Sequence, residues 1–310
     1  MMGLMTSFDA ITIGETMVAL VPDDAQPITG DSRMVLRVAG AESNVATSLA
    51  RLGHQVRWMS AVGADPFGEI ITRELAEAGV DMSAVTVSSD APTGIFAKNQ
   101  QGESTRVHYY RKGSAASRMD RSVLEQIGDA RLVHISGITP ALSESCRELT
   151  DAVMGLDTTI SFDVNYRPAL WASVAEAASV LADLARRADI VFVGRDEAEV
   201  LWGTASVEDV RSFLPEPRIL VVKDAAIEAV SFDDEGLVRV PSERVTVVEP
   251  VGAGDAFAAG WLSAYLSGRG AAERLKLGHL LASRAVQIVG DCPPAPTPEE
   301  IDAFLMEETR

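Results

Sequence analysis

The chain has 310 residues, of which 47% are hydrophobic, and this length and composition fit one folded domain with a full apolar core. Its net charge of −18, without any basic block, argues against binding to nucleic acids or to anionic membrane surfaces. Two cysteines without a CxxC motif predict neither a disulfide framework nor a zinc site, and the lack of a signal-peptide pattern favours a reducing compartment, the cytoplasm.

The first part of the chain alternates apolar strand patterns with amphipathic helix patterns. Strands are predicted at Ala10–Ile13 and residues 56–62, and helices at residues 45–53 and 65–80. Four β-like runs interrupt this alternation, at residues 18–21, 34–38, 93–99 and 105–111, and a short polar loop with glycine joins the last two as in a hairpin. We therefore predict a small lid sheet, from about 15–38 and 93–111, that stands off the main domain.

The alternation then resumes and continues to the end of the chain. Strands are predicted at 131–135, 159–164, 190–193 and 219–222, helices at 143–154, 174–187, 196–201, 273–289 and from 298, and a hairpin at 229–232 and 237–240. Such alternation implies a parallel sheet with helices on both faces, and ligands bind at the carboxyl edge of such sheets. Polar clusters are predicted at that edge, namely Gly14-Glu15, Gly63-Ala64-Asp65, Asn165-Tyr166-Arg167, Lys223-Asp224 and Gly252-Ala253-Gly254-Asp255.

The last of these clusters enters a long apolar helix that begins after a glycine turn. The β-branched pair Val247-Val248 before the turn is typical of a strand end. Glycines at the start of a helix let an anion approach its unpaired N–H groups. A carboxylate does not bind an anion, so Asp255 is either a helix N-cap or a base that takes a proton from a hydroxyl attacking a phosphoryl group held there.

The run GAGDAFAAG resembles the signature of the ribokinase-like (PfkB-type) carbohydrate kinases, and the resemblance covers about residues 10–308. It implies an α/β fold: a ribokinase-like three-layer sandwich with a mostly parallel central sheet, helices on both faces and a small β-sheet lid, as a single domain over residues 1–310. It also implies that Asp255 is the catalytic base. The amides of Gly252, Ala253 and Gly254 would then form the anion hole.

The stretch AGAESN, residues 39–44, resembles the element of that family that lines the sugar site. The resemblance places Gly40, Ala41 and Asn44 on the sugar side, although Ala39 replaces the first glycine of the family pattern. The alternative is an ordinary helix start, with Asn44 pointing to solvent.

Arg111, in YYRKGSA (109–115), ends the predicted lid strand at 105–111, and Arg167, in FDVNYRPALW (162–171), follows a predicted strand. A guanidinium suits a carboxylate ligand, but Arg111 and Arg167 could equally pair with acidic residues of the surface. Together with HISGITPAL (134–142), these stretches resemble the 2-keto-3-deoxygluconate kinase branch of the family. The resemblance implies ATP-dependent phosphorylation of the terminal hydroxyl of this sugar acid. Its carboxylate and keto end would contact Tyr109, Arg111 and Arg167, with Asp291 also on the substrate side.

Two stretches depart from the family pattern. In the Asn-x-x-Glu element Gly194 replaces the asparagine, whereas Glu197 remains and would organise Mg²⁺ through water. The nucleotide loop Lys-x-Gly-x-x-Gly keeps Lys223 but has lost both glycines, one of them to Ala225. The resemblance assigns ATP contacts to Asn165, Lys223, Ala225, Gly252 and Gly254. We expect the altered loop to weaken ATP binding or to change its shape.

Two other functions remain open from the sequence. One is a kinase of a neutral sugar such as fructose or ribose, which the tyrosine and arginine of the lid disfavour. The other is a non-catalytic sugar-acid sensor, which the altered nucleotide loop favours and Asp255 disfavours. The open edges of the predicted lid sheet favour a homo-oligomer that forms through the lid.

Overall fold

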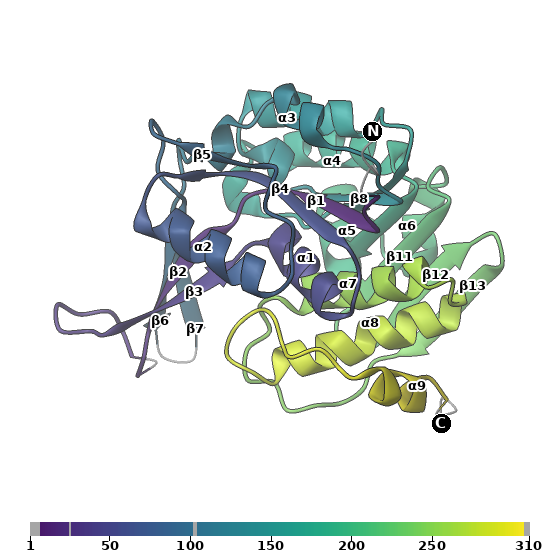
Figure 1. The fold of residues 1–310 in the computed structure, drawn as a ribbon. Coiled ribbons are helices and arrows are strands. Elements are labelled where there is room, and N and C mark those ends of the chain that lie inside the picture. Colours follow the sequence, from purple (N-terminus) through teal and green to yellow (C-terminus); the bar gives the residue numbers. More distant parts are fainter. Residues whose placement is uncertain (1–6, 25, 102–103, 307–310) are drawn as a thin grey trace, which may run out of the picture.

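The computed structural model describes residues 7–24, 26–101 and 104–306, and it confirms the predicted α/β architecture (Figure 1). The strands of its large sheet are β1 (Ala10–Ile13), β4 (Val56–Gly63), β5 (Val85–Ser88), β8 (Leu132–Ser136), β9 (Thr159–Asp163), β10 (Ile190–Gly194), β11 (Ile219–Asp224), β12 (Glu228–Asp233) and β13 (Gly236–Pro241). Their order across the sheet is β13-β12-β11-β10-β9-β8-β1-β4-β5. All neighbours pair in parallel from β11 to β5, whereas β12 and β13 are antiparallel.

Helices cover both faces of this sheet, as the sequence predicts, and make three layers. One face packs on α1 (Ala41–Arg51), α2 (Pro66–Glu77), α7 (Ala253–Leu266) and α8 (Ala271–Val286), with α9 (Pro298–Met306) beyond α8. The other face packs on α3 (Glu144–Val153), α4 (Val174–Arg187), α5 (Arg195–Trp202) and α6 (Val207–Phe213). The central strand β10 is apolar along its length because alternate residues enter opposite cores: Ile190 and Phe192 face one, Val191 and Val193 the other.

A second sheet, the lid sheet, stands off the large one at the lower left of Figure 1. It contains β2 (Met17–Pro22), β3 (Met34–Ala39), β6 (Ile95–Gln101) and β7 (Ser104–Tyr110), in the order β3-β2-β6-β7. Its two faces differ in their packing. Val18 packs in the same core as α1 and α2, whereas Met17 and Phe96 form a small cluster on the opposite face.

Some local predictions were wrong, and the reasons are physical. Val247 and Val248 belong to no strand; their side chains are 58% and 56% exposed, so their apolar character does not reflect burial in the sheet. The sequence also does not predict β5 or α6. β5 is a four-residue edge strand with exposed Val87. No helix in the described part of the chain is long and apolar enough to cross a membrane.

Candidate active site

The glycine turn at residues 252–254 leads into α7, as the sequence predicts. Gly252 is the N-cap residue and has a φ of +82°, a value that favours glycine. A Cβ atom there would lie 2.9 Å from the Cα of Asp291, so the backbone of the two segments is closely packed. The first intrahelical bond runs from the amide of Ala256 to the carbonyl of Gly252 at 2.9 Å. The preceding amides of Gly254 and Asp255 have no backbone acceptor among the described residues, which makes this end of α7 a site for an anion.

The carboxylate of Asp255 is held by amide groups from two distant elements. The Nδ2 atom of Asn44, in the first turns of α1, donates to its Oδ2 at 2.8 Å. The Nδ2 atom of Asn165, just after β9, donates to its Oδ1 at 3.4 Å. Asp255 is not the helix cap, because Gly252 occupies that position. The alternative that Asp255 serves only as an N-cap is therefore wrong.

The surroundings of Asp255 bring the pKa of its carboxyl group close to neutral pH. Burial raises the pKa of its carboxyl group to about 7, against the hydrogen bond from Asn44, which lowers it. The nearby carboxylates of Asp163 and Asp291 raise this pKa further, whereas Arg167 lowers it. A general base is most effective when its pKa lies near the working pH, so this carboxyl is suited to accept a proton.

Asn165 is one of two described residues other than glycine with a positive φ, at +39°. Asparagine tolerates this left-handed conformation better than most residues, and such conformations cluster at functional sites. Its Oδ1 atom is buried and has no hydrogen-bond partner among the described residues. The side chain therefore offers a free acceptor beside Asp255.

Lys223, at the end of β11, brings a positive charge to the glycine turn. Its Nζ atom donates to Asp163 at 2.8 Å, and a Cβ atom on Gly254 would lie 3.5 Å from it. Burial opposes the charge, but the carboxylates of Asp163 and Glu197 outweigh burial and raise the pKa of Lys223. The lysine is therefore charged at neutral pH next to the predicted anion site.

Glu197, in the first turn of α5, has both carboxylate oxygens occupied. They accept hydrogen bonds from the amides of Tyr166 and Gly194, each at 2.8 Å. The residues that the structure describes contain no group of three or more His, Cys, Asp or Glu side chains that could hold a metal ion. Glu197 thus connects the segment after β9 with the start of α5.

Of the residues predicted on the sugar side, Asn44 lies next to Asp255. Asn44 is only 4% exposed, so the alternative that it points to solvent is wrong. Its Nδ2 atom also lies 3.5 Å from Oδ2 of Asp291. Helix α1 begins at Ala41, earlier than the sequence indicates, and a Cβ atom on Gly40 would lie 2.6 Å from the carbonyl oxygen of Glu15. Gly40 therefore allows α1 to start against the end of β1.

Arg111 and Arg167 occupy different environments. Arg111 pairs with the buried carboxylate of Glu15, to which its Nε donates at 2.7 Å, and its side chain is 10% exposed. Arg167 is 50% exposed and lies 3.9 Å from Glu197, so its guanidinium is open to a ligand. Tyr109, which is 46% exposed, lies beside Phe96 and Arg111. Arg111 is therefore not a surface arginine. Because it is paired with Glu15, its guanidinium is less available to a substrate carboxylate than the sequence suggests.

The sequence does not reveal the role of Glu15. It predicts Gly14-Glu15 at the carboxyl edge of the sheet, but no partner for the carboxylate. The structure shows Glu15 receiving a second bond, from Oγ of Ser114. A buried acidic residue directly after a strand indicates that a cation or donor must cover it, but the identity of that partner depends on the tertiary fold.

The altered nucleotide loop closes a tight hairpin between β11 and β12. Asp224 pairs with Glu228, and Ala225 has a φ of +44° at one of the positions where the family has glycine. A residue with a side chain is destabilised by roughly 1–2 kcal/mol in this left-handed conformation. Replacing it with glycine removes this strain, but part of the gain is lost because glycine makes the unfolded chain more flexible.

We expect Ala225→Gly to raise the free energy of unfolding by about 0.5–1 kcal/mol, because it removes this strain. Urea unfolding of the two proteins measures the difference. Ala226→Gly is the matched control: Ala226 does not have a positive φ, so its replacement should destabilise the protein. A loss of stability in both variants would show that Ala225 is not strained.

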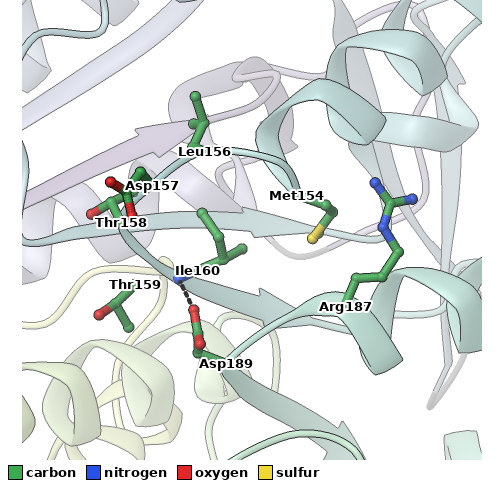
Figure 2. Close-up of a pocket in the computed structure, with 8 residues that line it drawn as sticks. All are labelled: Met154, Leu156, Asp157, Thr158, Thr159, Ile160, Arg187 and Asp189. Atoms are coloured by element: carbon green, nitrogen blue, oxygen red, sulfur yellow. Dashed lines mark hydrogen bonds between the residues drawn. The ribbon is translucent and has the colours of Figure 1, made fainter.

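A hollow of about 370 Å³ lies elsewhere, at the opposite edge of the sheet (Figure 2). Its lining includes Thr159, the first residue of β9, and Asp189, which precedes β10 and accepts a hydrogen bond from Ile160 at 2.8 Å. Strand starts form this edge, whereas Asp163 and Lys223 mark the strand ends. The hollow is therefore separate from the site at Asp255.

Comparisons with known proteins agree with this geometry. The family model described as pfkB family carbohydrate kinase matches residues 8–298. The 2-dehydro-3-deoxygluconokinase of Bacillus subtilis (strain 168) is 37% identical over 314 residues, covering 96% of this chain and 95% of that protein. The 2-dehydro-3-deoxygalactonokinase of Haloferax volcanii is 31% identical, covering 96% of each.

Solved structures give the same result. The PfkB protein from Polaromonas sp. JS666 has a TM-score of 0.85 and 36% identity, over 96% of this chain and 99% of that one. The fructokinase from Xylella fastidiosa with bound ATP has a TM-score of 0.84 and 25% identity, over 96% of this chain and 98% of that one.

Proposed function

We propose that this chain, which belongs to the pfkB family of carbohydrate kinases, is a 2-dehydro-3-deoxygluconokinase that uses ATP and Mg²⁺. The sugar acid, 2-dehydro-3-deoxygluconate, is also called 2-keto-3-deoxygluconate. One observation carries the proposal: the carboxylate of Asp255, with a pKa of about 7, stands beside the open amides at the start of α7. This arrangement supports transfer of a phosphoryl group to a hydroxyl.

In the proposed mechanism, Asp255 accepts the proton of the terminal hydroxyl group of the sugar. At the same time the hydroxyl oxygen bonds to the phosphorus of the γ-phosphoryl group. The bond from that phosphorus to the ADP oxygen breaks at the same time. Asn44 orients the carboxylate through its 2.8 Å hydrogen bond. The amides of the glycine turn and the charge of Lys223 stabilise the negative charge on the transferred group.

The residues around the glycine turn fit a magnesium nucleotide. When bound, Mg²⁺ would neutralise charge on the phosphate oxygens, and it is commonly held by those oxygens, a few carboxylates and water. Glu197 has both oxygens bonded to amides, which suits a role through water. Asn165 offers the unpartnered Oδ1 atom as an acceptor for such a water, and Lys223 and Ala225 would lie on the nucleotide side.

We place the carboxylate of the sugar acid at the lid, with Arg167 as its open cation and Tyr109 beside it. Arg167 supports this placement because half of its side chain is exposed and because its positive charge is close enough to lower the pKa of Asp255. Gly40, Ala41 and Asp291 would line the hydroxyl side. In this arrangement Arg111 adds directional donors rather than a full charge, since Glu15 neutralises it.

A coupled kinase assay with 2-dehydro-3-deoxygluconate, its galactonate epimer, fructose and ribose tests the proposal. We expect kcat/KM to be highest for one of the two sugar acids. A preference for fructose or ribose would leave only the wider kinase family. Calorimetry with Mg-ATP alone and with each sugar acid alone separates a kinase from a sensor, because a sensor would bind the sugar acid but not Mg-ATP.

We also propose that the protein is a homo-oligomer that pairs through the lid sheet. The outer strands β3 and β7 carry Leu36 and Tyr110, which are 39% and 65% exposed. An open sheet edge with exposed apolar side chains favours association. Sedimentation velocity measures the state, and a monomer at micromolar concentration would contradict the proposal.

A further inference from the structure

An ion pair joins the lid sheet to the segment that precedes the glycine turn. The Nζ atom of Lys98, on β6, contacts Oε1 of Glu249, 151 positions later in the sequence. The side chains are only 12% and 18% exposed, so this is not a solvated surface pair. Lys98 lies on the same face of the lid sheet as Phe96. Val107, which is opposite Lys98 on the neighbouring strand β7, packs against the cluster that contains Phe96.

The carboxylate of Glu249 also connects two backbone segments at the glycine turn. Its Oε2 atom accepts the amide of Gly290 at 3.3 Å. Glu249 is followed by Pro250 and the turn, and Gly290 is followed by Asp291, whose Cα would lie 2.9 Å from a Cβ atom on Gly252. One carboxylate therefore fixes both segments that set the position of Gly252, and one lysine of the lid holds that carboxylate.

Lys98 is also close to the sugar side of the site. Burial raises the pKa of the Asp291 carboxyl group, and the charge of Lys98 lowers it. The lysine could therefore serve as a ligand for the substrate carboxylate. The geometry disfavours this role, because its ammonium is already committed to Glu249 in a pair largely shielded from solvent.

We propose that Lys98 and Glu249 form a latch, in which Lys98 is a positioning residue that couples the closed lid to the geometry of the glycine turn. This inference rests on the proposed kinase function and identifies how the sugar side controls the phosphoryl side. When the lid moves away, Glu249 loses its cation, and the turn loses a constraint on the amides that receive the phosphoryl group. Phosphoryl transfer is then favoured only under a closed lid, which excludes water.

We expect Lys98→Met and Glu249→Gln each to lower kcat roughly tenfold, the effect of one lost charge-assisted hydrogen bond. The KM for the sugar should change less than about threefold, because neither side chain binds it. The double variant should lose no more than the worse single one, since both changes break the same contact. Lys98→Arg should recover most of the kcat of the wild type.

Lys112→Met is the matched control, because it removes an exposed lysine just beyond β7 and should leave kcat unchanged. Thermal unfolding of every variant confirms that it is folded at the assay temperature. The kinetics are measured on the sugar that the wild type phosphorylates best, so an error in the substrate assignment leaves the test intact, and KM is also compared between a sugar acid and a neutral sugar. Three results would overturn the latch: multiplicative losses in the double variant, an unchanged kcat in Lys98→Met, or a KM increase confined to sugar acids, which would make Lys98 a substrate ligand.

Discussion

Asp255→Asn should lower kcat by roughly 10²–10⁴-fold, because a positioned general base contributes that much to the rate. Binding of the sugar acid should persist, since the amide keeps the size of the side chain and can still bond to neighbouring groups. Single-turnover assays measure the transfer step, and calorimetry measures the binding. Asp234→Asn, which changes an exposed aspartate in the turn between β12 and β13, is the control and should keep full activity. A variant of Asp255 with more than about a third of the wild-type kcat would argue against a general base on the same scale.

The same carboxyl predicts the pH dependence of the wild type. Its pKa is raised to about 7, mainly by burial, so the base is protonated and inactive below this pH and ionised above it. We expect kcat/KM to fall about tenfold per pH unit below about pH 7. The residual activity of Asp255→Asn should lack this limb. A wild-type profile that stays flat down to pH 5 would mean that another group takes the proton.

Arg167→Met should raise the KM for the sugar acid roughly 10- to 150-fold, the equivalent of a charge-assisted bond of about 1.5–3 kcal/mol. The KM for a neutral sugar should change much less, because no carboxylate is bound there. Assays at two salt concentrations distinguish a direct contact, which persists, from a diffuse attraction, which fades. Equal losses for both kinds of sugar would show that Arg167 does not recognise the carboxylate.

Arg111 is a less clean target for the same question. Its replacement would leave the carboxylate of Glu15 buried without a cation, and breaking a buried pair typically costs about 3–5 kcal/mol of stability. A loss of activity in Arg111→Met therefore mixes unfolding with substrate recognition. Arg167, with half of its side chain in solvent, separates the two effects.

Local sequence patterns predicted the elements that local interactions determine. Strand β10 is a continuous apolar run because both of its faces are covered, and the glycine turn needs residues that expose backbone amides. Such features can be read from a few neighbouring residues. Val247 and Val248 show the limit of this approach, since an apolar pair in an exposed segment has the same pattern as a strand end.

The contacts that make the site could not be predicted in the same way. Asn44 meets Asp255 across 211 positions of sequence, and Arg111 meets Glu15 across 96. Which residues meet over such distances depends on the order of strands in the sheet. The sequence therefore identified the residue types near the edge of the sheet. The structure was needed to show that Arg111, one of the two arginines, forms an ion pair with Glu15.

The hydrogen bond between Asn44 and Asp255 also bears on how activity arises during folding. It joins α1 to α7, so the site combines the early part of the chain with its last third. Contacts of such high sequence separation form late, because a long loop must close before they contribute any stabilisation. A nascent chain that has grown only to residue 250 already contains the strands of the large sheet and of the lid, but it has no base. Catalytic competence is thus acquired near the end of synthesis, after most of the sheet can form.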